Sequence, residues 1–447
     1  MTGAGLRVQG DAFALACAMF ALACGLVSPA RSAEAPAGPR ETEISYYYDL
    51  VDQTLFRPVS RTLDPVIGIR RLTGSKREAV NVDAQGAIRL PSTWWQPRLG
   101  FRPVTVDQLL HGPGPSTGQA PGPWTVTRAK TQGVTPGFFI KDAAGQRFII
   151  KFDPRKQPEM ATGADVVSSY LLWGAGFNVP DNVIVHFRRE DLRFESGAQY
   201  TDVIGRKRPI SDEFLDKLLA RVPQREDGSY RAVASRLLSG RPLGPFEYRG
   251  RRRDDPEDLI PHQHRRELRG FWTLCAWLSH ADSRGPNSLD MWVTEGGRSF
   301  VRHHLIDFGS CLGSGAVAAR SPQTGSEYFV DYGVMTRALL TLGLHRPAWE
   351  ASVDPGLPSI GFIEGDTFDP DSWRPDYPNP AFDERTRADI EWGARIVAGF
   401  SDAHIRAAVE QGKFSNPRAT DYLTKVLIKR RDKIVRQWLG GQAGATP

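Results

Sequence analysis

The sequence predicts an α+β protein of two lobes, a strand-rich lobe followed by a helical lobe, with an N-terminal extension. Short apolar segments separated by Gly- and Asp-containing turns fill the middle third of the chain. A Ser-Gly-Arg-Pro cluster at 239–242 then interrupts the pattern, and apolar residues at helical spacing follow it. The predicted boundaries are 1–33 for a signal peptide, 34–120 for the extension and its linker, 121–239 for the strand-rich lobe and 240–440 for the helical lobe.

The composition allows a large hydrophobic core and argues against a nucleic-acid partner. Of the 447 residues, 40% are hydrophobic, which is too many for a chain that is disordered throughout. The net charge of +6 and the pI of about 9.1 are mildly basic, but the charge is spread over the whole chain. Binding of phosphate groups fits this charge, whereas binding of nucleic acid is not expected.

The first residues have the pattern of an export signal. Arg7 precedes an uncharged apolar run at 12–27, and small residues suited to signal peptidase follow at 28–33. The run has 16 residues, fewer than the roughly 20 that span a bilayer. We therefore expect an exported protein, periplasmic or extracellular. The loose lipobox around Cys24 leaves a lipoprotein as a second interpretation, and a buried N-terminal helix is the third. Membrane attachment is expected only through this leader or a lipid anchor.

The secondary structure of the extension and of the strand-rich lobe is predicted from local sequence patterns. The extension holds a short helix in YYYDLVDQTLF, a Trp94-Trp95 pair expected to pack on the main body, and a Gly/Pro-rich linker. The strand-rich lobe is predicted to contain strands in WTVTRAK, FFIKD, QRFIIKF, NVIVHF and YRAVASRLL, and helices at about 162–174 and in SDEFLDKLLARV. Ser211 is expected to cap the second of these helices, with Glu213 in its first turn.

The chain after Gly240 is predicted to be helical. Asp255-Pro256 suits the start of a helix, and HRRELRGFWTLCAWLSH has apolar residues on one helical face. The last predicted helix, at about 418–439, has a basic end that suits a solvated face more than a nucleic-acid patch. Once the leader is removed, Cys275 and Cys311 remain. The sequence is compatible with a disulfide between them and equally with two buried free thiols.

Two polar motifs flank a strand-like segment in the helical lobe. His280-Ala281-Asp282 ends a predicted helix, and Asn287 follows five residues after the aspartate. Asp307-Phe308-Gly309 follows the apolar end of a strand. Upstream, Lys151 ends a predicted strand, and the segment from Gly133 to Gly137 lies between two strands, where a loop covering phosphates would lie.

The pattern HxDxxxxN followed by DFG resembles the catalytic and metal-binding loops of protein kinases. It looks most like the atypical kinases, which include bacterial toxin kinases, spore-coat kinases and secreted kinases. The resemblance covers about residues 124–439 and is limited to motifs. It implies a two-lobed protein-kinase-like fold that binds ATP with Mg²⁺ or Mn²⁺.

The resemblance also implies a role for each site residue. Asp282 would act as the base or orient the acceptor hydroxyl, and Lys151 would position the phosphates. Asp165 is the preferred acidic partner of Lys151, with Glu159 as the alternative. The remaining roles are metal binding by Asn287 and Asp307 and a phosphate-covering loop at Gly133 and Gly137. The backbone near Leu238 to Arg241, which includes Gly240 and is expected at the strand-to-helix junction, would contact the adenine edge.

Several features depart from ordinary protein kinases. The glycine loop reads GVTPG instead of GxGxxG, and the motif around Asp282 lacks the arginine of HRD. Asn287 and Asp307 lie 20 residues apart, which implies a longer hairpin between them. No APE motif follows, so a standard peptide-docking segment is in doubt.

These observations lead to one functional hypothesis with two alternatives. The chain is expected to be an exported ATP- and metal-dependent kinase-like phosphotransferase that acts on a protein or sugar hydroxyl. The alternatives are a non-catalytic kinase-like binding module and nucleotidyl transfer by the same residues. His262, His264, His303 and His304 fit structural roles better than a metal site, because no cysteine or HExxH motif accompanies them.

Overall fold

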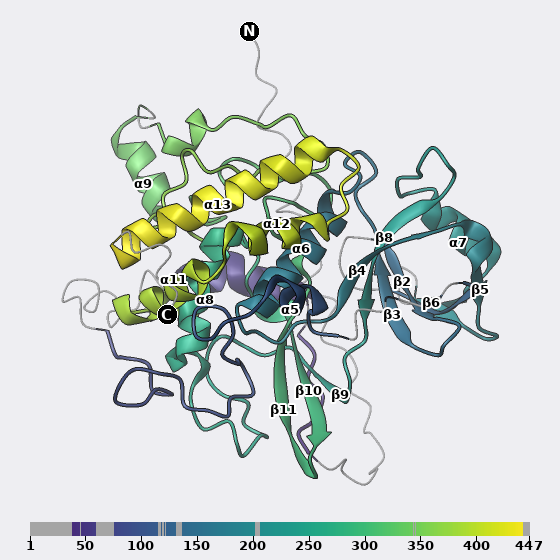
Figure 1. Ribbon diagram of the computed structural model, residues 1–447, viewed down its shortest axis with the longest axis horizontal. Helices are drawn as coiled ribbons and strands as arrows, with labels where there is room; N and C mark the ends of the chain where they lie inside the picture. Colours follow the sequence, from purple (N-terminus) through teal and green to yellow (C-terminus); the bar gives the residue numbers. More distant parts are fainter. Residues whose placement is uncertain are drawn as a thin grey trace. The chain divides into compact units, whose positions relative to one another are not determined.

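The computed structural model describes residues 38–44, 46–59, 76–114, 118, 120, 122–130, 136–201, 206–342, 344 and 346–440 (Figure 1). The chain divides into two units, Met1–Gly38 and Pro39–Pro447, and the second contains nearly all described residues. The predicted signal peptide and Gly133 lie outside the described residues. Among the helices that are described, none is long and apolar enough to cross a membrane.

The strand-rich part is a six-stranded sheet in the order β4-β8-β3-β2-β1-β5. Neighbouring strands are antiparallel except for the parallel pair β1 and β5. The strands are β1 (Trp124–Ala129), β2 (Gly137–Lys141), β3 (Arg147–Lys151), β4 (Asn182–Phe187), β5 (Leu192–Phe194) and β8 (Tyr230–Arg236). A separate pair joins β6 (Gln199–Thr201) to β7 (Lys207–Pro209).

One face of this sheet forms its own hydrophobic core. Along β3, the buried side chains of Phe148 and Ile150 alternate with more exposed ones, as expected for a strand with one apolar face. The helix α7 (Asp212–Leu219) contributes Leu215 to the same core. Ser211 caps this helix by accepting a 3.3 Å hydrogen bond from the backbone N–H of Phe214, as the sequence predicted.

A second core forms among the helices. It includes side chains of α6 (Met160–Gly174), α8 (Arg266–Leu278) and α11 (Arg387–Ala398). The long helix α13 (Pro417–Leu439) packs against α8, α11 and α12, and is the yellow helix of Figure 1. The predicted α+β class, with a strand-rich and a helical part, is confirmed. Further helices in the described residues are α5 (Val106–His111), α9 (Tyr332–Leu340), α10 (Pro380–Asp383) and α12 (Asp402–Glu410).

The prediction that the chain becomes helical directly after Gly240 is wrong. Residues Arg241–Gly244 form β9, which joins β10 (Ser288–Glu295) and β11 (Arg298–Leu305) in a three-stranded sheet. The local pattern hid β9 because its partner, β10, lies more than forty residues further along the chain. The first α-helix after Gly240 is α8, and the segment around Asp255 and Pro256 is made of turns.

The N-terminal extension is built into the helical core. Trp94 and Trp95 are 4% and 3% exposed, so the prediction that they pack on the main body is confirmed. The indole N–H of Trp95 donates a 2.7 Å hydrogen bond to the backbone oxygen of Ala175, directly after α6. The extension also forms α2 (Tyr46–Val51) and a following π-helical turn at Asp52–Phe56, where the sequence predicted a short helix.

Cys275 and Cys311 are free, buried thiols. Burial raises the pKa of both thiols, so they remain protonated at neutral pH. Of the two alternatives left open by the sequence, the structure has the pair of buried thiols.

Candidate active site

The hairpin of β10 and β11 brings Asn287 close to Asp307. Ser288 pairs with Leu305 across the ladder, and the backbone N–H of Ile306 donates a 3.0 Å hydrogen bond to the oxygen of Asn287. Asn287 and Asp307 are 20 positions apart, and the two strands and their turn account for this separation, as the spacing predicted. Asn287 and Asp307 end up at the same end of the hairpin.

The loop that carries Asp282 is held by Asn287. The α8 helix ends at Leu278, and Ser279 adopts a left-handed conformation with φ of 49° that turns the chain away from the helix. The side-chain N–H of Asn287 donates a 2.7 Å hydrogen bond to the backbone oxygen of Asp282. This bond links the two polar residues of the HxDxxxxN motif.

His280 packs between the helix and the Asp-Phe-Gly segment. Its ring lies 5.8 Å from that of Phe271 and 6.2 Å from that of Phe308, measured between ring centroids, and both contacts are edge-on. Burial lowers the pKa of His280 to about 4, so the ring is neutral at physiological pH. His280 thus contributes packing between two motifs, without a positive charge beside Asp282.

Lys151 lies between two carboxylates. Its ammonium forms an ion pair with Asp165 of α6 and a second one, at 3.1 Å, with Oδ1 of Asp307. Asp165 also accepts hydrogen bonds from the side chain of Asn182 at 2.9 Å and the backbone N–H of Phe308 at 3.3 Å. These contacts connect the sheet, α6 and the Asp-Phe-Gly segment at one point.

The acidic partner of Lys151 is therefore Asp165 and not Glu159. Glu159 instead accepts hydrogen bonds from the backbone N–H and the hydroxyl of Ser415, at 2.9 and 3.1 Å. Asp165 lies inside α6 and faces the end of β3, as a mid-helix position can.

The charges of Lys151 and Asp307 support each other, whereas burial raises the pKa of Asp165 and repulsion by Asp307 adds to this rise. Burial opposes the charge of Lys151, but the attraction of Asp165 and Asp307 outweighs burial and raises the pKa of the lysine. The same attraction from Lys151 holds the pKa of Asp307 below its usual range. At neutral pH the lysine is therefore positive and Asp307 negative.

Asp307 and Asn287 have the donor chemistry of a site for a hard cation. Asp307 has φ of 62°, in the left-handed region, and its side chain is 50% exposed. Lys151 contacts only one of its two carboxylate oxygens. The amide nitrogen of Asn287 is directed to Asp282, which leaves its carbonyl oxygen as a donor. Two such oxygens, completed by phosphate oxygens, suit Mg²⁺ or Mn²⁺. Within the described ranges, no group of three or more His, Cys, Asp or Glu side chains could hold a metal ion unaided.

The glycine-loop prediction is only partly covered by the structure. Gly137 is the first residue of β2, and a Cβ there would collide with the backbone oxygen of Ile150 on β3. This packing accounts for the glycine without a phosphate. Its backbone oxygen accepts a 3.0 Å hydrogen bond from the N–H of Lys130, the residue that follows β1.

Lys130 is a second basic residue at this site, and the sequence analysis missed it. Burial lowers the pKa of its ammonium, attraction by Asp307 opposes this effect, and repulsion by Lys151 adds to it. These electrostatic interactions place Lys130 near the Lys151 cluster. The signal in the sequence is a lysine directly after a strand and next to a glycine-containing loop.

The expected adenine-contact segment lies between two strands and not at a strand-to-helix junction. Leu238 and Gly240 connect β8 to β9. Gly240 has φ of 101°, and a Cβ there would collide with the backbone oxygen of Trp292 on β10. The geometry accounts for Gly240 through this close approach. A role of the Leu238–Gly240 backbone in adenine binding stays a prediction.

Two arginines near Asp282 were also missed. Arg284 donates a 2.6 Å hydrogen bond from Nε to Oδ1 of Asp282. Arg320 pairs with Asp376, whose backbone N–H donates a 2.9 Å hydrogen bond to the oxygen of Ala281. Arg284 is two residues after Asp282 in the sequence, so its proximity to this aspartate could have been expected. Arg320 is far along the chain and reaches the loop only through the fold.

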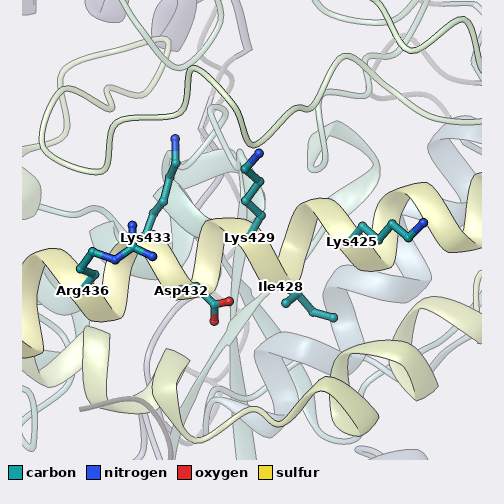
Figure 2. A pocket seen from close by; sticks show the side chains of 6 residues that line it. All are labelled: Lys425, Ile428, Lys429, Asp432, Lys433 and Arg436. Carbon is teal, nitrogen blue, oxygen red and sulfur yellow. The ribbon is translucent and has the colours of Figure 1, made fainter. Parts of the chain in front are cut away.

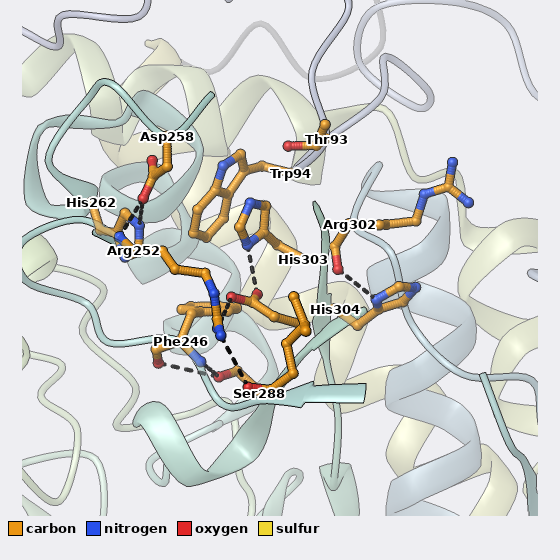
Figure 3. A network of polar contacts seen from close by, with 12 residues as sticks. Thr93, Trp94, Phe246, Arg252, Asp258, His262, Ser288, Arg302, His303 and His304 are labelled. Carbon is orange, nitrogen blue, oxygen red and sulfur yellow. Dashed lines mark hydrogen bonds and ion pairs between the residues drawn. The ribbon is translucent and has the colours of Figure 1, made fainter. Parts of the chain in front are cut away.

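The histidines outside the motif have structural roles, as expected. Nδ1 of His303 lies 2.6 Å from Oδ1 of the buried Asp290. The ring of His303 stacks on that of Trp94, and both are labelled in Figure 3. His262 pairs with Asp258 at 2.8 Å, and His304 pairs with the backbone oxygen of Arg302 at 3.2 Å. The stacking of His303 on Trp94 joins the extension to the β10–β11 hairpin.

A shallow groove on α13 contains none of the predicted site residues. Its volume is about 280 Å³, and Figure 2 shows several long basic side chains along it. Lys429 pairs with the carboxylate of Asp366, and Lys433 donates to the backbone oxygen of the same residue. The residues that line the groove are Lys425, Ile428, Lys429, Asp432, Lys433 and Arg436.

Comparison with known proteins finds loose likenesses to solved kinase structures. The proinflammatory kinase CtkA of Helicobacter pylori overlaps with a TM-score of 0.36 at 11% identity, over 71% of this chain and 97% of that one. The Golgi casein kinase overlaps with a TM-score of 0.32 at 9% identity, over 76% and 77%. Its Mn/ADP-bound structure gives 0.32 at 10% identity, over 75% and 77%.

No family model and no curated protein matches the chain. At these TM-scores the structural overlaps are loose, and they do not bear on the chemistry of the site.

Proposed function

We propose that this chain is an exported, ATP- and metal-dependent kinase-like phosphotransferase that acts on a protein or sugar hydroxyl. The observation that carries the proposal is the position of Lys151 between Asp165 and Asp307. Phosphoryl transfer requires a lysine steadied by an acid, next to a carboxylate that can hold a metal ion. The half-exposed carboxylate of Asp307 is accessible to a ligand, whereas Lys151 and Asp165 are buried.

The proposed reaction uses the γ-phosphoryl group of ATP. The acceptor oxygen forms a bond to the γ-phosphorus, the bond from that phosphorus to the bridging oxygen breaks, and ADP leaves with the electron pair. The proton of the acceptor hydroxyl passes to the carboxylate of Asp282. Oδ1 of Asp282 accepts from Arg284, which leaves Oδ2 for the acceptor.

The remaining residues would bind and orient ATP. Lys151 and Lys130 would contact phosphate oxygens, and the backbone from Leu238 to Gly240 would contact the adenine edge. Asn287 and Asp307 would hold Mg²⁺ or Mn²⁺, which when bound neutralises charge on the phosphates. The hydrogen bond from Asn287 to Asp282 keeps the metal-binding and acceptor-binding residues at a constant distance.

A non-catalytic nucleotide-binding module is the second candidate. Two contacts favour it, because Arg284 occupies one oxygen of Asp282 and Lys151 occupies one oxygen of Asp307. In such a module these ion pairs would serve the fold and nucleotide binding, and the second oxygen of Asp282 would accept no proton. Nucleotidyl transfer by the same residues would differ from kinase activity only in the group that is transferred.

Binding and transfer can be tested separately. Calorimetry on the full chain with ATP and either Mg²⁺ or Mn²⁺ should show binding that depends on the metal. ADP release and labelling of the protein by ATP should then show slow turnover that Asp282→Asn removes. ATP binding without turnover would favour the non-catalytic module, and AMP on the product would favour nucleotidyl transfer. Absence of ATP binding by a folded sample would contradict the proposal.

A further inference from the structure

Arg284 connects the N-terminal extension to the loop at residues 280–287, which carries Asp282 and Asn287 and is called the catalytic loop below. Its Nε donates to Oδ1 of Asp282 at 2.6 Å, and its Nη1 donates to Oδ2 of Asp49, on α2, at 2.5 Å. Asp49 and Arg284 are 235 residues apart in sequence. The side chain of Gln53, four residues after Asp49, donates a 3.3 Å hydrogen bond to the other oxygen of Asp49. Both oxygens of Asp49 are thus engaged.

This ion-pair chain is largely shielded from water. The exposed fractions of the side chains are 3% for Asp49, 12% for Arg284 and 18% for Asp282. Burial opposes the charge of Arg284, but the two carboxylates outweigh burial and raise its pKa. A guanidinium held at Nε and Nη1 has its plane fixed, so the contact also has a defined orientation.

Backbone contacts bring the extension to this place. The N–H and the hydroxyl of Thr42 donate to the backbone oxygen of Leu243 on β9, at 3.0 and 3.1 Å. Gly244 has φ of 86°, and a Cβ there would collide with the oxygen of Thr42. The side chain of Ile44 reaches Gly285, in the catalytic loop. The chain leading into α2 is therefore docked along β9 before Asp49 meets Arg284.

We propose that Asp49 is a positioning residue of the active site, which holds Arg284 against the carboxylate of Asp282. This inference rests on the proposed phosphotransfer. With Arg284 fixed on Oδ1, the other oxygen of Asp282 keeps a constant direction towards the acceptor hydroxyl. Without Asp49, Arg284 can take other rotamers and Asp282 loses its orientation, while the nucleotide-binding residues are unchanged. The extension is then part of the active site, and not only a segment that leads into it.

The test compares Asp49→Asn with Asp49→Glu and a matched control. Asp52→Asn is the control, because Asp52 lies in the same extension and pairs with Arg57, at 2.5 Å, and not with the catalytic loop. ATP affinity, kcat for ADP release and amide hydrogen exchange of residues 280–287 are measured on the full chain. For Asp49→Asn we expect kcat to fall by about tenfold, ATP affinity to stay within twofold and exchange of the loop to accelerate. Asp49→Glu should restore at least half of kcat, and Asp52→Asn should resemble the wild type.

Each other outcome overturns the inference. Wild-type kcat in Asp49→Asn would show that Asp49 is not needed, and a higher kcat would show that the contact inhibits. Equal losses of kcat in Asp49→Asn and Asp52→Asn would show that the loss comes from a less stable extension and not from the contact with Arg284. If the wild type binds no ATP, the proposed function fails. In that case amide hydrogen exchange still tests the contact. Unchanged exchange of residues 280–287 in Asp49→Asn would show that Asp49 is not coupled to the loop. Faster exchange would show that the contact stabilises the loop but has no role in catalysis.

Discussion

Lys151 and Asp165 form a buried ion pair that joins the last residue of β3 to the middle of α6. Their side chains are only 11% and 2% exposed. Asp165 also accepts from the backbone of Phe308, so the pair sets the position of the Asp-Phe-Gly segment. The positions of β3, α6 and the Asp-Phe-Gly segment therefore depend on one pair of opposite charges.

Replacing Lys151 by methionine should weaken both stability and ATP binding. The change leaves Asp165 buried without its counter-ion, which costs roughly 3–5 kcal/mol in comparable pairs. ATP affinity should fall at least tenfold, because a phosphate contact is lost. Denaturant melts and calorimetry measure the two effects.

The double variant K151M/D165N separates stability from binding. Neutralising Asp165 should recover most of the free energy of unfolding, because no unpaired charge remains buried. ATP affinity should stay low in the double variant. Normal ATP binding by a folded K151M protein would show that Lys151 does not contact the nucleotide.

Asp307→Asn should remove the metal dependence of ATP binding without harming the fold. Asparagine tolerates the left-handed conformation at this position, and Lys151 keeps Asp165 as its partner. The loss of a charged oxygen donor should lower ATP affinity at least tenfold in Mg²⁺ or Mn²⁺. The exposed Asp369 offers a control, since Asp369→Asn removes the same charge elsewhere. Equal effects of the two variants on titration calorimetry would contradict the metal assignment.

The buried His304 should make the protein less stable as pH falls. Burial, with repulsion from Arg302, lowers the pKa of His304 from 6.5 to about 4. The unfolded chain therefore binds a proton that the folded chain does not, so stability is full above pH 6.5 and declines as pH falls towards 4. His280 contributes in the same direction.

His304→Gln should flatten this decline. The wild type should lose about 1–3 kcal/mol more than the variant between pH 7 and pH 4.5, as measured by urea unfolding at several pH values. His111→Gln, on the exposed side of α5, is the control. Parallel curves for wild type and His304→Gln would show that His304 is not the source of the pH dependence.

The cap of α7 should make a measurable contribution to the stability of the sheet part. Ser211→Ala removes the acceptor for the N–H of Phe214 and should cost about 0.5–2 kcal/mol. Ser211→Asp keeps an acceptor and places a negative charge at the helix N-terminus, so it should be close to the wild type. Thermal unfolding of the three proteins provides the comparison, and equal melting temperatures for all three would contradict the role of the cap.

Much of the secondary structure could be predicted because its causes are local. Alternating burial marks β3, helical spacing marks α8, and Ser211 marks the start of α7. The strand β9 could not be found in this way, because its partner β10 comes more than forty residues later. The single strand contains too few residues to show a period of its own.

The order and residue types of the motifs alone determined which groups could take part in the chemistry: Lys151, Asp282, Asn287 and Asp307. Only the tertiary structure decided how they meet. It selected Asp165 over Glu159, because a mid-helix side chain of α6 faces the end of β3. It also brought Asp49 to Arg284 across 235 residues. Ion pairs and hydrogen bonds act over a few ångströms in space, and a sequence does not contain the long-range pairings that set those distances.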